Sequence, residues 1–210
     1  MIQVVAFDCD GVMFDSGEAN AAYYNRILGH LGRAPMDEVQ RTFTHMNTVD
    51  ASLRFLFPDP ADYDAAQSLR RKMTYLPFIR HMRIEPHLRA LLQRLRSACH
   101  TAVATNRTDT MDRVLEEHDL AGEFDLVVGA LDVARPKPDP ECLQKILAHF
   151  GIAPRQMIYI GDSSLDAEAA AAAGVPFIAF RNRELEAAEH IDTLDVVADI
   201  VMRSGTRLPA

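Results

Sequence analysis

Short apolar runs alternate with longer amphipathic stretches along most of the chain. Five runs are rich in β-branched or small residues without strict alternation, which is typical of strands covered on both faces. They are QVVAF (3–7), TAVAT (101–105), FDLVV (124–128), MIYI (157–160) and PFIAF (176–180). Helical periodicity fills the gaps between the later runs, over 86–98, 108–120 and 140–151. This order predicts an α/β fold, a Rossmann-like core with a mostly parallel sheet of about five strands and helices on both faces.

The interval from residue 17 to residue 83 breaks this alternation. It holds four stretches with helical periodicity and no evident strand, namely 18–32, 36–46, 48–57 and 62–82. Because the block sits between the first and second predicted strands, we expect an inserted helical domain that covers the sheet. The predicted division is a Rossmann-like core, residues 1–16 and 84–210, and a helical cap domain, residues 17–83.

Composition and charge narrow the class of protein. The chain has 210 residues, of which 48% are hydrophobic and 25% charged, as in ordinary globular proteins. Its net charge of -8 argues against generic nucleic-acid binding, which needs basic surface. No apolar stretch approaches the roughly 18 residues of a membrane helix, and the first residues show no secretory signal. The odd set Cys9, Cys99 and Cys142 predicts reduced thiols, so we expect a cytoplasmic protein without a membrane partner.

Polar side chains gather directly after the predicted strands. In a doubly wound sheet, ligands bind beyond the carboxyl ends of the strands, so these side chains should share one rim. They are Asp8, Asp10, Thr105, Asn106, Lys137, Asp162 and Asp166. Four carboxylates against a single ammonium would repel a phosphate dianion, and a hard divalent cation resolves that conflict. The sequence therefore predicts a Mg²⁺-assisted phosphoryl-transfer site.

The motifs DCDGVMFDS, Thr105-Asn106, Lys137 within RPKPDP, and GDSSLD resemble the four motifs of the haloacid dehalogenase superfamily, in its phosphoglycolate-phosphatase-like branch. They occur in that family's order, and the helical interval matches the position of its cap. The resemblance implies a Mg²⁺-dependent phosphatase that forms an aspartyl-phosphate.

The resemblance also assigns the site residues. It makes Asp8 the nucleophile and a metal ligand, and Asp10 the general acid and base, with its carbonyl oxygen on the metal. Thr105 and the Asn106 N–H would hold the phosphoryl oxygens, and Lys137 would neutralise Asp8 and the transferring group. Asp162 becomes a metal ligand, and Asp166 orients Lys137 or a metal-bound water. From the neighbouring anions we expect a raised pKa for Asp10.

Two alternatives belong to different classes of function. A sugar-phosphate mutase resembling β-phosphoglucomutase shares the first motif, but such enzymes usually carry a histidine at the position of Asn20 and an acid at that of Gly161. A non-catalytic binding module would have lost one of the key residues, and each is present. The substrate is expected to be a small phosphorylated metabolite. The stretch 43–55 is the expected specificity segment, with His45, Asn47 and Arg54 as candidate contacts.

Overall fold

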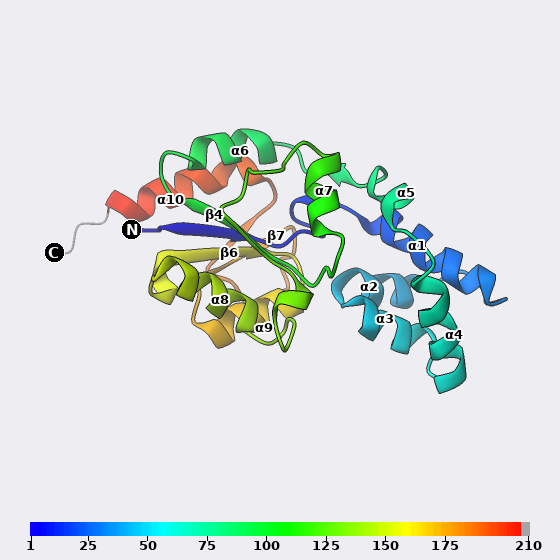
Figure 1. Ribbon diagram of the computed structural model, residues 1–210. Helices are drawn as coiled ribbons and strands as arrows, with labels where there is room; N and C mark the ends of the chain where they lie inside the picture. The colour runs from blue at the N-terminus through cyan, green and yellow to red at the C-terminus, as the bar shows by residue number, and fades with distance from the viewer. Residues whose placement is uncertain (207–210) are drawn as a thin grey trace.

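The computed structural model describes residues 1–206 and contains a six-stranded sheet between two layers of helices (Figure 1). The strand order is β5-β4-β1-β6-β7-β8, and every neighbouring pair is parallel. The strands are β1 (Val4–Phe7), β4 (His100–Ala104), β5 (Leu126–Val128), β6 (Met157–Gly161), β7 (Phe177–Phe180) and β8 (Glu189–Ile191). The prediction of a Rossmann-like α/β fold is confirmed.

The sheet is covered on both faces, which explains why its strands lack a polar side. In β1, Val5 and Phe7 belong to a hydrophobic cluster with α6 and α10, whereas Val4 and Ala6 pack with α8 and α9 on the opposite face. Figure 1 shows these helix pairs on the two sides of the sheet. The helices are α6 (Leu88–Leu95), α7 (Met111–Glu117), α8 (Glu141–Phe150), α9 (Ser164–Ala173) and α10 (Val197–Thr206). Single-turn 3₁₀ helices occur at Ala130–Asp132, Pro154–Gln156 and Leu194–Val196.

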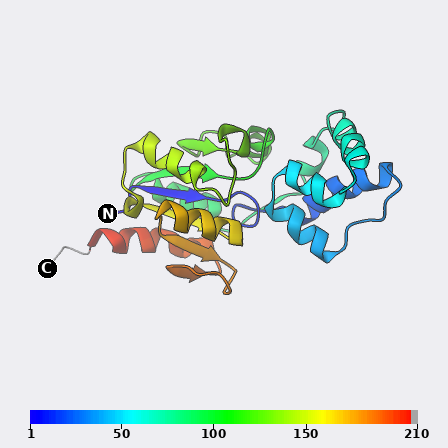
Figure 2. The same ribbon diagram turned by 90° about the horizontal axis from the view of Figure 1, so that it is seen from below.

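The segment from residue 17 to residue 83 forms a separate group of helices beyond one end of the sheet (Figure 2). They are α1 (Gly17–His30), α2 (Glu38–Met46), α3 (Val49–Leu56), α4 (Pro60–Arg70) and α5 (Leu76–Ile79). A two-stranded antiparallel ribbon of β2 (Phe14–Asp15) and β3 (Arg83–Ile84) joins the segment to the sheet. The division into a core and a cap stays a prediction, and positions 207–210 of the predicted core lie outside the described residues.

The break between α4 and α5 and the edge strand β8 are two of the differences from the sequence-based expectation. The single helix expected over 62–82 is interrupted, because α4 ends at Arg70 and α5 begins at Leu76. Pro77 lies in the first turn of α5, where its missing N–H costs nothing, but it could not sit inside a continuous helix. The short edge strand β8 was not expected from its sequence, Glu-His-Ile, of which only Ile191 is fully buried.

The helices of the described residues are too short or too polar to cross a bilayer.

Candidate active site

The candidate site lies where the order of the strands reverses direction. Strand β1 is central, and the chain proceeds to β4 on one side and later to β6 on the other, which opens a crevice at the carboxyl ends of β1 and β6. Asp8 directly follows β1, and Asp162 directly follows β6. A pocket of about 510 Å³ opens there, and both the sheet rim and the segment 17–83 contribute to its walls.

Lys137 is the centre of a buried charge network at the base of this pocket. Its Nζ atom lies 2.7 Å from Asp8 Oδ1 and 2.6 Å from Asp166 Oδ1, and it also donates to the Tyr159 hydroxyl at 2.9 Å. The Lys137 side chain is 3% exposed. Burial lowers the pKa of Lys137, but the charges of Asp166 and Asp8 outweigh burial and hold this pKa above its ordinary value. Lys137 is therefore a cation fixed against two carboxylates.

A side chain hydrogen-bonded to the backbone and a helix cap hold Lys137 and Asp166 in position. The Asn106 side chain accepts the Lys137 backbone N–H at 3.0 Å and donates to the Lys137 carbonyl at 3.1 Å, so it fixes the backbone that carries the ammonium. Ser163 caps the N-terminus of α9 in a capping box with Asp166. One Asp166 oxygen accepts from the Ser163 hydroxyl and backbone, and the other from Lys137 and Tyr159.

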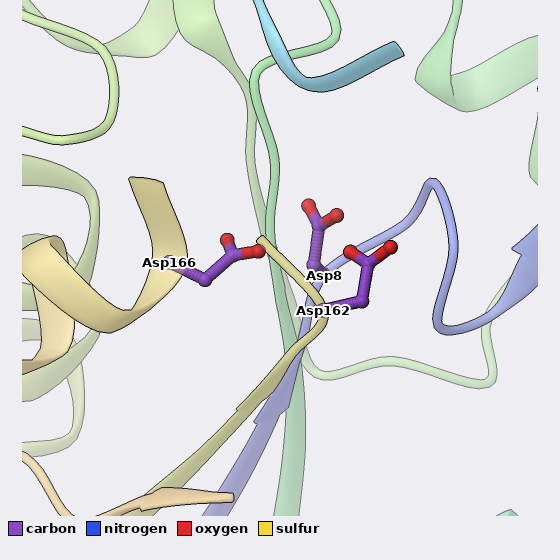
Figure 3. A group of neighbouring side chains, drawn as sticks. All are labelled: Asp8, Asp162 and Asp166. Carbon is purple, nitrogen blue, oxygen red and sulfur yellow. The ribbon is translucent and has the colours of Figure 1, made fainter. Parts of the chain in front are cut away.

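Three carboxylates, those of Asp8, Asp162 and Asp166, lie close together at this rim (Figure 3). Asp8, Asp162 and Asp166 each offer an oxygen within 4.8 Å of those of the other two. Burial raises the pKa of Asp8 to about 7; the Lys137 charge opposes this rise, while Asp166 and Asp10 add to it. Burial also raises the pKa of Asp162, and the charges of Asp166 and Asp8 raise it further. Their ionised forms thus need a further positive charge.

The donor set fits a hard divalent cation. Within residues 1–206, no hydrogen-bond donor contacts the Asp162 carboxylate, whereas both oxygens of Asp166 are already engaged. Gly11 lets Asp162 approach: a Cβ atom at Gly11 would lie 2.0 Å from Asp162 Oδ2, and its φ is +86°. The unpaired oxygens of Asp162 and the second oxygen of Asp8 are the hard ligands that Mg²⁺ prefers.

Asp10 is held differently from the sequence-based expectation. Arg107 grips its carboxylate with two donors, Nε to Oδ2 at 2.7 Å and Nη2 to Oδ1 at 2.6 Å, and the Ser16 hydroxyl also donates to Oδ1. Burial by itself raises the pKa of Asp10, but the charge and hydrogen bonds of Arg107 outweigh burial and lower it. The expected raised pKa is therefore wrong, because the nearest charge is a cation rather than an anion.

The remaining predicted residues divide into two sets. Thr105, Asn106, His45 and Asn47 line the pocket, together with Asp8, Asp10, Lys137 and Asp162. Arg54 is not among the lining residues; its side chain is 64% exposed, pairs with Asp50 at 2.9 Å and lies over the Tyr63 ring. The pocket lining therefore gives no support to a substrate contact by Arg54.

Arg107 lines the pocket but was not predicted from the sequence as a site residue. Arg107 directly follows Thr105-Asn106 and is 8% exposed. Its place immediately after two predicted phosphate ligands could have marked this arginine as a candidate site residue. Nothing in the sequence indicated its partner, because Asp10 is 97 positions away in the chain. Tyr75 was also missed, although its hydroxyl donates to Asn20 on α1 inside the pocket.

Comparisons with known proteins agree with this geometry. Haloacid dehalogenase-like hydrolases match residues 5–180. A phosphoglycolate phosphatase of Salmonella typhi is 30% identical over 203 residues, covering 84% of this chain and 80% of that protein. Among solved structures, a HAD-superfamily hydrolase of subfamily IA from Geobacter sulfurreducens has a TM-score of 0.79 and 38% identity, covering 95% of this chain and 96% of the other. CbbY from Rhodobacter sphaeroides in complex with phosphate shares the fold, with a TM-score of 0.73 and 24% identity over 92% and 95% of the two chains.

Proposed function

Because the chain belongs to the haloacid dehalogenase-like hydrolase family, we propose that its pocket hydrolyses a small phosphorylated metabolite through an aspartyl-phosphate on Asp8. The chain is a phosphatase, a phosphoric monoester hydrolase, as its relatives are. The observation that carries the proposed mechanism is the buried contact of Lys137 with both Asp8 and Asp166, next to the unpaired Asp162. This arrangement supplies a nucleophile, a fixed positive charge and a cation site in one pocket.

In the first half of the proposed reaction, a carboxylate oxygen of Asp8 attacks phosphorus. A bond from Asp8 to phosphorus forms, the bond to the leaving alcohol breaks, and the alcohol takes a proton from Asp10. Thr105 and the Asn106 N–H hold the phosphoryl oxygens, and Lys137 neutralises the charge. Phosphoryl transfer needs positioning and charge neutralisation above all, and Lys137, fixed by several partners, supplies both.

In the second half, water attacks the phosphorus of the aspartyl-phosphate. The water gives its proton to the Asp10 carboxylate, the bond from Asp8 to phosphorus breaks, and inorganic phosphate leaves. Asp8 is then a carboxylate again, beside Lys137. The ionised form of Asp10, favoured by Arg107, is the form that this step requires.

We propose Mg²⁺ as the cation, held by Asp8, Asp162 and the carbonyl oxygen of Asp10. The acceptor-only oxygens of this set and the absence of thiolate or imidazole ligands in it favour a hard cation. When bound, the ion withdraws charge from the phosphoryl oxygens. Asp166 does not join the proposed ligand set, because Lys137, Tyr159 and Ser163 already use its oxygens.

We propose that residues 17–83 act as a cap that selects the leaving group, with His45 and Asn47 as substrate contacts. Both line the pocket, whose volume of about 510 Å³ suits a small molecule. Gly161 argues against the sugar-phosphate mutase alternative: a Cβ atom there would lie 2.4 Å from Asp166 Cβ, so Asp166 occupies the space that an acid would need. The free thiols of Cys9, Cys99 and Cys142 support a reducing, cytoplasmic setting.

Phosphate release from a panel of phosphorylated metabolites, with p-nitrophenyl phosphate as a generic substrate, tests the proposal. We expect Mg²⁺-dependent release that EDTA stops, and Asp8→Asn should fold without turnover. Retained turnover by Asp8→Asn would refute the nucleophile. A mutase would instead convert β-glucose 1-phosphate, with a bisphosphate primer, into glucose 6-phosphate rather than free glucose.

A further inference from the structure

Arg107 connects three parts of the molecule that meet at the pocket. Its backbone belongs to the loop after β4, and its guanidinium grips Asp10 in the loop after β1. The same guanidinium lies 3.5 Å from Met82 Sδ and 3.5 Å from the Tyr75 hydroxyl, both in the segment 17–83. Its Nη1 donates to Thr110 Oγ1 at 3.3 Å. With a side chain only 7% exposed, Arg107 has no room for another orientation without breaking these contacts.

The hydrogen bonds around Asp10 fix the orientation of its carboxylate. All three recorded contacts of its carboxylate come from donors: the Ser16 hydroxyl and two nitrogen atoms of Arg107. An ionised carboxylate accepts about four hydrogen bonds and donates none, so this arrangement leaves acceptor capacity on Asp10. A bidentate arginine also fixes the plane of the carboxylate, which a single contact would not do. Asp10 is thus presented to the pocket as an oriented proton acceptor.

We propose that Arg107 is a positioning residue for the second half of the reaction, in which it holds the Asp10 carboxylate in place to take the proton from the attacking water. The proposal rests on the proposed function, because it needs an aspartyl-phosphate on Asp8. It assigns Arg107 no contact with the reacting atoms. Tyr75 joins the arrangement as a lesser support, through its hydroxyl and a ring 5.2 Å from the guanidinium carbon.

The test separates the two halves of the reaction with p-nitrophenyl phosphate. Its leaving group departs without a proton, so formation of the aspartyl-phosphate does not need Asp10 as an acid. For this substrate kcat/KM reports that formation, and kcat reports hydrolysis of the aspartyl-phosphate when hydrolysis is slow. For Arg107→Met we expect kcat to fall by roughly 10²-fold, at the lower end of general-base effects, with kcat/KM unchanged. Acid-quenched protein in the steady state should carry a phosphoryl group, seen in its intact mass.

Two further variants sharpen the test. Arg107→Lys keeps the charge but not the bidentate grip, so its kcat should lie between those of wild type and Arg107→Met. In an Asp10→Asn background, Arg107→Met should lower kcat no further, because the residue that it positions has lost its function. Arg94→Met, at an exposed ion pair with Asp199, is the control for the exchange of an arginine for methionine.

A general structural role for Arg107 would give a different result. An equal loss of kcat and kcat/KM in Arg107→Met, or no phosphorylated protein during turnover, would overturn the proposal. If circular dichroism shows that Arg107→Met does not fold, the losses of kcat and kcat/KM are compared in Arg107→Lys instead. A wild-type kcat in Arg107→Lys would also overturn the proposal. Failure of the proposed function is distinguishable, because the wild-type enzyme would then never form an acid-stable phosphoryl adduct that Asp8→Asn removes.

Discussion

The two walls of the pocket are built in different ways. On the sheet rim, Asp8, Lys137 and Asp166 are 9%, 3% and 0% exposed, and Lys137 has several short contacts with groups from other strands and loops. On the wall formed by residues 17–83, His45 is half-buried, and its recorded side-chain contact is with Asn20 at 3.5 Å. The charged groups of the rim are fixed by one another, whereas His45 on the opposite wall makes a single long contact.

We propose that this difference separates chemistry from substrate recognition. A buried network of opposite charges permits one arrangement, because each unpaired charge in it would be costly. Side chains with few partners can change, and a new substrate can be accommodated without disturbing the rim. We therefore expect changes on the rim to alter both folding and turnover, and changes on the opposite wall to alter the choice of substrate.

The largest effect is expected from Lys137→Met, which would leave Asp8 and Asp166 buried without their cation. Breaking a buried ion pair in this way destabilises a protein by about 3–5 kcal/mol, so the urea midpoint should fall strongly and turnover should be lost. Lys145→Met is the control, because Lys145 is exposed and donates to the Asp132 carbonyl. A midpoint no lower than that of the control would mean that the rim is not held together by its charges.

The sequence was sufficient to predict the rim because its residues follow strands. The apolar runs locate β1, β4 and β6, and parallel strands bring Asp8, Thr105 and Asp162 to one edge. It could not show that Arg107 pairs with Asp10, because that contact joins two loops whose relative position depends on packing. The break between α4 and α5 was predictable from Pro77, but the helical periodicity through 62–82 obscured it.

A second prediction concerns the approach of Asp162 to the loop after β1. In Gly11→Ala, the added methyl group would overlap Asp162 Oδ2, so the carboxylate must leave its present position. Perturbing the surroundings of a metal ligand typically lowers metal affinity by about 10–100-fold, and we expect the Mg²⁺ concentration for half-maximal turnover to rise accordingly.

Gly122→Ala is a matched control for this experiment. Gly122 has a φ of +79°, close to the +86° of Gly11, but no atom lies within 4 Å of its added Cβ. Both variants therefore strain the backbone, and only Gly11→Ala crowds Asp162. The same Mg²⁺ requirement in both variants would show that backbone strain, rather than the position of Asp162, is responsible.

A smaller effect is expected from pH. Burial raises the pKa of Asp8 from 3.8 to about 7, so the folded metal-free protein binds more protons than the unfolded chain between these values. Stability contributed by this group is present at low pH and is lost as the pH rises toward 7. Thermal unfolding is measured in EDTA at intervals of roughly one pH unit. From pH 5 to pH 7, the Tm of wild type should fall more steeply than that of Asp8→Asn. Parallel curves for the two proteins would contradict the raised pKa.

The smallest effect is expected from Arg54→Ala, which tests how far the substrate-contacting part of residues 17–83 extends. Arg54 is exposed, pairs with Asp50 one turn away and does not line the pocket, whereas His45 lies on the same segment and does. We expect Arg54→Ala to leave kcat and KM unchanged for every substrate in the panel, and His45→Ala to change KM for some substrates and not others. A substrate-dependent KM in Arg54→Ala would contradict this limit and would extend the substrate-contacting surface to the exposed side of α3.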